Sequence, residues 1–151
     1  MKIIGIDTGV QTGFAIYCTE RKELERVSTL MIHQALFIVR TMQEQGAVMK
    51  VYIEDARLAT QGRANSRSGK YIDPKVLAKE QAKSQGVGSV KGHAKIWEDF
   101  LTDLQIPFQC VRPNPAITKW DAPKFKKLTS WVGRTSEHAR DAAMIAFTKK
   151  S

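Results

Sequence analysis

The chain has 151 residues, of which 42% are hydrophobic and 26% charged, a balance typical of a globular domain and not of a disordered segment. No uninterrupted apolar stretch approaches the roughly 18 residues of a membrane-spanning helix, so we expect no membrane partner. The chain reaches a carboxylate at Asp7, too early for a secretory signal peptide. The two cysteines, Cys18 and Cys110, have the spacing of neither a metal knuckle nor a disulfide framework. We therefore expect a single domain, residues 1–151, in a reducing cytoplasm.

The positive charge is concentrated in two segments. The 24 Lys and Arg residues outnumber the 15 Asp and Glu residues, which gives a net charge of +9. Residues 55–95 carry +6 and residues 111–134 carry +5, whereas residues 1–54 are neutral. Two basic blocks on a neutral frame are typical of a protein that binds a polyanion, and nucleic acid is the interpretation we favour. A basic surface that only aids solubility is the alternative.

The expected elements form an α/β protein with a mixed sheet. Apolar and β-branched runs predict strands over residues 2–8, 13–18, 24–30, 47–54 and 107–111. Helical spacing of apolar residues predicts helices over residues 31–45, 75–85, 93–104 and 137–148, with Ser136 capping the last. Three antiparallel strands are followed by strands joined through helical crossovers. We expect a polar, basic loop over residues 55–74 and a linker before the last helix.

Two of the expected strands end on a carboxylate. Asp7 closes the first strand, and Glu54 closes the strand over residues 47–54. If these strands are neighbours, both carboxylates emerge at one end of the sheet, about 4.8 Å apart. Two buried carboxylates side by side repel each other, and hard divalent cations relieve that repulsion. For either residue alone, a solvated strand end is the simpler interpretation.

The last helix adds two further candidate ligands. His138 and Asp141 are three residues apart and therefore share one helix face. Alone, this pair also fits an ordinary pair on a helix surface. Together with Asp7 and Glu54, it completes the oxygen-rich set that two-metal phosphodiester hydrolysis requires, in which one ion activates the attacking water and the other stabilises the leaving oxygen.

These motifs resemble those of a known family. Residues 3–15 (IIGIDTGVQTGFA) are similar to the first motif of the RuvC-type Holliday junction resolvases, which belong to the RNase H-like superfamily. Residues 51–54 are similar to the family's second motif, and residues 138–143 to its C-terminal motif. Residues 85–90 look like the Gly-rich entry to the family's dimer helix. The resemblance covers nearly the whole chain, with the motifs in the family's order.

The resemblance implies an RNase H-like fold, a homodimer, and paired symmetric nicks in four-way (Holliday) DNA junctions. It implies two Mg²⁺ ions in each active site, with Mn²⁺ as a possible substitute. Asp7 would bridge the two ions, Glu54 would join one, and Asp141 with His138 would hold the other. Some family members have a carboxylate in place of His138, so proton transfer and orientation of the scissile phosphate stay open as roles for this residue.

The chain departs from the bacterial pattern between Glu54 and Gly86 and again before the last helix. The first segment is longer than in the bacterial family and heavily basic, the second carries Trp120 and Trp131 among four lysines, and the pattern looks more like phage-encoded relatives. We expect them to contact DNA phosphates, which position a substrate without reading its sequence. The predicted DNA-binding residues are Arg57, Arg63, Arg67, Lys70, Lys119, Lys124, Lys126, Lys127 and Arg140.

Three other functions fit part of the pattern. A related RNase H-like nuclease acting on RNA or on other branched DNA would use the same metal chemistry. An actin-type ATP-binding protein shares the phosphate loop that residues 5–9 resemble, but the chain is too short for its duplicated domain and has no second loop of this kind. A non-catalytic junction-binding module would keep the basic segments and would have no use for the acidic set.

Overall fold

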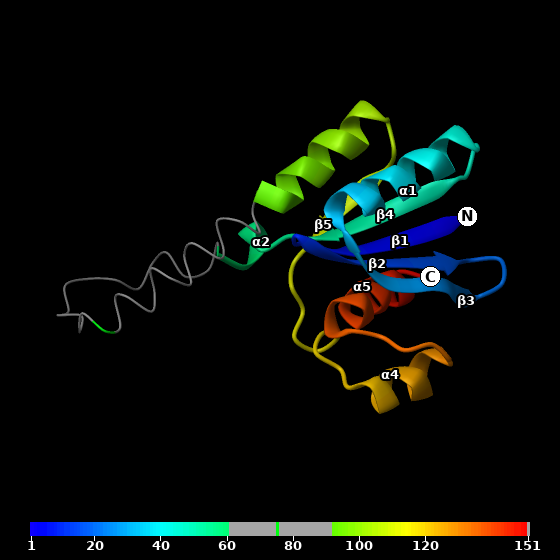
Figure 1. Cartoon of the computed structure of the whole chain (residues 1–151), viewed down its shortest axis with the longest axis vertical. Coiled ribbons are helices and arrows are strands. Elements are labelled where there is room, and N and C mark those ends of the chain that lie inside the picture. The colour runs from blue at the N-terminus through cyan, green and yellow to red at the C-terminus, as the bar shows by residue number, and fades with distance from the viewer. Residues whose placement is uncertain (61–74, 76–91, 151) are drawn as a thin grey trace.

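The computed structural model describes residues 1–60, 75 and 92–150. Their five strands form one mixed sheet in the order β3-β2-β1-β4-β5 (Figure 1). Strand β1 pairs antiparallel with β2 and parallel with β4, while β3 and β5 form the two edges. The strands are β1 (Lys2–Asp7), β2 (Gln11–Cys18), β3 (Glu23–Met31), β4 (Met49–Glu54) and β5 (Phe108–Val111). The predicted antiparallel hairpin and mixed sheet are confirmed.

Helices cover both faces of the sheet. Helix α1 (Ile32–Glu44) and the helix over residues 92–103 lie on one side, and α4 (Ala122–Thr129) and α5 (Glu137–Thr148) lie on the other (Figure 1). This α/β architecture is the predicted fold class and is consistent with an RNase H-like fold. Each helix in the described part of the chain is too short or too polar to cross a membrane.

The helices of the structure differ from the predicted ones at two places. Helix α2 (Arg57–Thr60) occupies part of the segment predicted as a loop, and α4 occupies part of the predicted linker. Asp121 caps α4 by accepting a hydrogen bond from the Lys124 amide at 2.8 Å, and Phe125 is fully buried beneath it. The rest of the predicted loop, the Gly-rich residues 85–90 and all but Lys75 of the predicted helix over residues 75–85 lie outside the described residues.

Strand alternation gives each face of the sheet its own core. On β1, Ile4 and Ile6 belong to the core on the side of α1, which also contains Trp97. Ile3 belongs to the core under α5. The same alternation at the end of β4 separates two adjacent carboxylates, because Glu54 faces the side of α5 and Asp55 faces the helix over residues 92–103.

Helix α5 approaches β1 and β2 almost backbone to backbone. A Cβ atom on Gly5 would lie 2.1 Å from the Ala142 carbonyl oxygen, and one on Gly13 would lie 2.0 Å from the His138 carbonyl oxygen. Ala139 and Ala142 are the small, buried residues on the inner face of the helix. Only glycine permits so close an approach, which fixes the first turns of α5 over the ends of β1 and β2.

Gly13→Ala should destabilise the protein and displace α5. The added methyl group meets the backbone of His138, which cannot rotate away as a side chain can. We expect a loss of about 1–3 kcal/mol in the free energy of unfolding, measured by urea denaturation. Gly92→Ala is the matched control because nothing lies within 4 Å of its Cβ position. Equal stability of the two variants would contradict this account of the packing.

Candidate active site

Asp7 and Glu54 lie side by side because β1 and β4 end together. The parallel register places Ile6 opposite Ile53, so the next residue of each strand emerges at the same end of the sheet. The Thr8 hydroxyl donates a hydrogen bond to the Glu54 carbonyl oxygen at 3.1 Å and ties the two strand ends to each other. The prediction that the strands ending on Asp7 and Glu54 are neighbours is confirmed.

Helix α5 brings the other two predicted residues to the same end of the sheet. The Ser136 hydroxyl caps the helix by accepting a hydrogen bond from the Ala139 amide at 3.1 Å. His138 Nδ1 lies 2.8 Å from Asp7 Oδ2 and joins α5 to β1 directly. Asp141, one turn further along, accepts a hydrogen bond from the Lys119 backbone amide at 2.8 Å. The fold therefore gathers residues 7, 54, 138 and 141 from three elements.

The three carboxylates form one electrostatically coupled group. Burial and the charges of Asp7 and Asp141 raise the pKa of Glu54 to about 7. Burial also raises the pKa of Asp7, and Asp141 adds to this effect, although the hydrogen bond from His138 opposes it. The pKa of Asp141 is raised chiefly by burial, against the opposing hydrogen bond from the Lys119 amide. Such a group is destabilised when all its members are ionised, and a divalent cation is the partner that would compensate it.

The spacing of these ligands bears on the kind of ion they fit. Among the residues that the structure describes, no three of these four offer donor atoms that all lie within 4.8 Å of one another. Ligand oxygens around two ions that are 3.5–4 Å apart span up to about 8 Å, since each ligand lies about 2.0 Å from its ion. Carboxylate oxygens are the hard ligands that Mg²⁺ and Mn²⁺ prefer, but these four residues form no single compact group of donors.

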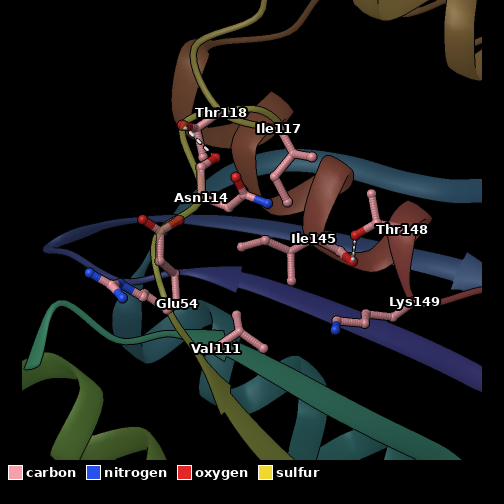
Figure 2. Close-up of a pocket in the computed structure, with 9 residues that line it drawn as sticks. Glu54, Val111, Asn114, Ile117, Thr118, Ile145, Thr148 and Lys149 are labelled. Carbon is pink, nitrogen blue, oxygen red and sulfur yellow. Dashed lines mark hydrogen bonds between the residues drawn. The ribbon is translucent and has the colours of Figure 1, made fainter. Parts of the chain in front are cut away.

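Glu54 also lines a pocket of about 240 Å³ beside this acidic group (Figure 2). The end of β5 and residues 112–118 form one wall, and the last turn of α5 forms the other. In Figure 2 the Glu54 carboxylate lies at one side of the pocket and the Lys149 side chain at the other. The pocket was not predicted, because its walls are far apart in the sequence.

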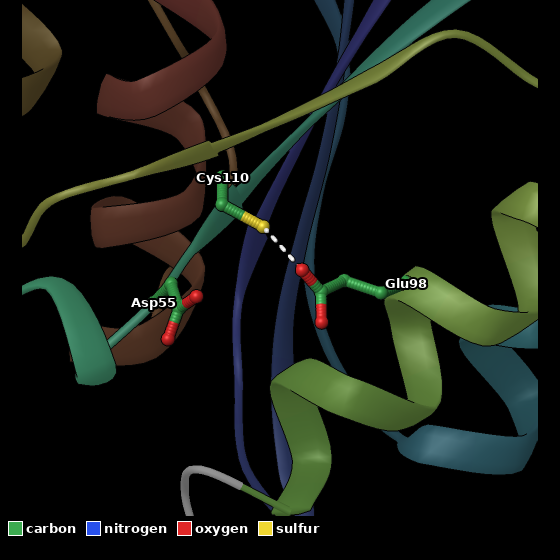
Figure 3. Close-up of side chains that lie close together, drawn as sticks. All are labelled: Asp55, Glu98 and Cys110. Carbon is green, nitrogen blue, oxygen red and sulfur yellow. Dashed lines mark hydrogen bonds between the residues drawn. The ribbon is translucent and has the colours of Figure 1, made fainter.

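A second group of metal-type ligands lies on the opposite face of the sheet. Asp55, Glu98 and Cys110 have donor atoms within 4.8 Å of one another (Figure 3), the only such group of three among residues 1–60, 75 and 92–150. Arg57 already engages this group, because its guanidinium lies 2.7 Å from Asp55 and 2.7 Å from Glu98. Burial and the neighbouring Glu98 raise the pKa of the Cys110 thiol to about 12, so it stays protonated at neutral pH. Ion pairs of Arg57 thus link Asp55, just after β4, to Glu98 on the helix over residues 92–103. Cys110 on β5 joins the group through a hydrogen bond from its thiol to Glu98.

The predicted DNA-binding residues fall into three sets. The side chains of Lys119, Lys126 and Lys127 are exposed on the side of the sheet that carries α5. Three others make internal contacts: Arg57 forms the ion pairs described above, Lys124 lies 4.0 Å from the centroid of the Trp120 ring, and Arg140 donates hydrogen bonds to the carbonyl oxygens of Trp120 and Thr135 at 2.7 and 2.9 Å. Arg63, Arg67 and Lys70 lie outside the described residues.

No protein-family model and no curated protein matches the chain. Asp7, Glu54 and Asp141 nevertheless converge with His138 at one end of the sheet, and burial raises the pKa values of the three carboxylates.

Glu54→Gln should stabilise the metal-free protein at alkaline pH. A carboxyl group whose pKa rises from 4.5 to about 7 on folding binds its proton more tightly in the folded state. The free energy of unfolding then falls as the pH rises from about 4.5 to about 7 and levels off above that range. In EDTA at pH 8, we expect the Tm of the variant to exceed that of the unmodified chain. The difference should be about 2–4 °C for each kcal/mol by which the substitution raises the free energy of unfolding. The difference should vanish at pH 4.

Glu44→Gln, at an exposed position on α1, is the matched control and should show no such pH-dependent gain. An equal Tm of the Glu54→Gln variant and the unmodified chain at pH 8 would show that the carboxylates at the strand ends do not destabilise the fold.

Proposed function

We propose that this protein is a metal-dependent endonuclease of the RuvC type that resolves four-way DNA junctions by paired symmetric nicks. The observation that carries the proposal is the convergence of Asp7, Glu54 and Asp141, with His138, at one end of a mixed sheet. Three partly buried carboxylates that repel one another are costly to the fold. A catalytic requirement for divalent cations explains why they are placed together.

In this proposal Asp7, Glu54 and Asp141 are the metal ligands, and His138 positions Asp7. When bound to these three carboxylates, divalent cations such as Mg²⁺ would supply the chemistry that activates a water and stabilises a leaving 3′-oxygen. His138 is 54% exposed, so its ring is open to water and substrate while its Nδ1 contacts Asp7. The Lys119 amide holds one oxygen of Asp141 and so sets the direction of that carboxylate.

The charge distribution supports a nucleic-acid substrate, and paired nicking calls for a second copy of the chain. Lys119, Lys126 and Lys127 are exposed on the same side of the sheet as α5. Each DNA phosphate that such a residue neutralises steepens the salt dependence of binding by about 0.9 log units. Paired nicks in opposite strands need two active sites, and one chain contains one set of these carboxylates, so the proposal includes a homodimer.

Asp7→Asn should abolish nicking and leave junction binding intact. The amide removes one negative charge at the centre of the site, while the basic residues that contact phosphates are unchanged. We expect a loss of at least about 100-fold in the rate of Mg²⁺-dependent nicking of a synthetic four-way junction, with a binding affinity within about twofold of the unmodified chain. Gel assays of nicking and of mobility measure the two quantities.

Asp103→Asn, at an exposed position on the opposite side of the sheet, is the matched control and should cut normally. Undiminished cleavage by Asp7→Asn would contradict the proposal. Cleavage of an RNA hairpin, with the junction left uncut, would instead favour the related RNase H-like nuclease.

A further inference from the structure

The pocket beside Glu54 is small and has aliphatic walls. Its aliphatic walls come from β5, from the segment that follows β5 and from α5, through Val111, Ile117 and Ile145. The volume of about 240 Å³ lies below the roughly 300–1,000 Å³ of pockets for drug-sized ligands. A volume of this size suits a single ring system better than a larger ligand.

The polar groups of the pocket are already oriented by hydrogen bonds to the backbone. The hydroxyl groups of Thr118 and Thr148 donate their protons to the carbonyl oxygens of Asn114 and Ile145, at 3.2 and 3.1 Å. Each hydroxyl therefore offers only lone pairs to a ligand. The Asn114 Oδ1 atom accepts from the Ala116 amide at 3.0 Å, which leaves its NH₂ group as a donor. In Figure 2 this NH₂ group lies between Ile117 and Ile145.

This combination favours a nucleobase over a phosphate. A nucleic-acid phosphodiester offers acceptors only, so the two threonine oxygens and the Glu54 carboxylate would oppose it inside the pocket, where the lining cations are exposed. A nucleobase has both donors and acceptors on its edges and an apolar face that packs against aliphatic side chains. Arg112 and Lys149 are exposed at the rim of the pocket, where they suit the phosphates on either side of a bound nucleotide.

We infer that this pocket binds one unpaired nucleobase of the substrate strand, next to the phosphate that is cut. Glu54 is shared between the pocket and the acidic group, so a base held there would set the position of the adjacent phosphate. The inference rests on the proposed function for its role in cleavage and predicts that nicking depends on the identity of one base.

The binding part of the inference is tested without cleavage and without metal. Amide and methyl NMR spectra of the full chain are followed during titration with each of the four deoxynucleoside monophosphates and with inorganic phosphate. At least one nucleotide should shift the signals of the Asn114 side chain, Ile117 and Ile145 to saturation, and inorganic phosphate should not. No response to any nucleotide, or the same response to phosphate alone, would overturn the inference.

Two variants locate the binding in this pocket. Thr148→Trp fills the pocket from the exposed last turn of α5, and Asn114→Asp keeps the bond to the Ala116 amide while it replaces the donor by an acceptor. Each should weaken nucleotide binding by at least about tenfold. Thr41→Trp is the matched control, because the Thr41 hydroxyl also donates to a helix carbonyl, that of Phe37 at 2.9 Å, but on α1. Unchanged binding by both pocket variants would contradict the inference.

A cleavage assay tests whether the pocket determines which base is preferred beside the nick. On junctions that differ in one base beside the nick, the unmodified chain should show a preference of about tenfold or more, and Thr148→Trp should reduce it. Base-independent nicking by the unmodified chain would overturn the role in specificity. If the chain cuts no nucleic acid, the proposed function fails, while the NMR titration still decides whether the pocket binds a base.

Discussion

The close approach of α5 to the sheet is the contact on which the candidate site depends. Gly5 and Gly13 have no side chain to separate the helix backbone from β1 and β2, and the alanines of α5 fill the remaining space. At this distance, His138 reaches Asp7 and the next turn places Asp141 beside the same strand end. A helix held further from the sheet, as larger side chains would require, would separate these groups. The tight packing of small residues thus determines the electrostatics of the site.

The pKa values of the carboxylates on the two faces of the sheet are shifted in opposite directions. Asp55 is buried, and burial alone would raise its pKa, but its hydrogen bonds with Arg57 outweigh that effect and lower the pKa. Glu54, the preceding residue, has no cation among the causes of its raised pKa, which are burial and two further carboxylates. On the face that carries Asp55, the ion pair with Arg57 therefore stabilises the ionised carboxylate within the fold. On the other face, His138 and the Lys119 amide only partly offset the burial of Asp7 and Asp141, and the pKa values of Asp7, Glu54 and Asp141 all stay raised.

Much of this arrangement follows from local patterns in the sequence. The ends of β1 and β4 on Asp7 and Glu54, the Ser136 cap and the spacing of His138 and Asp141 are each visible within one element. Helix α4 was missed because its eight residues include a proline and three lysines, although Asp121 and Phe125 gave a usable signal for a capped helix. The group of Asp55, Glu98 and Cys110 and the pocket beside Glu54 join distant segments. No local pattern predicts them, because they arise only when β5 and its neighbouring helices pack on the sheet.

In the proposed function, the carboxylates of Asp7, Glu54 and Asp141 form a binding site for divalent cations. Anomalous diffraction from a crystal of the protein soaked in Mn²⁺ tests it most directly, because it locates the bound ions without reference to activity. We predict Mn²⁺ peaks in contact with these three carboxylates. Mn²⁺ bound only at Asp55, Glu98 and Cys110, or no peak beside Asp7 at a saturating concentration, would contradict the account.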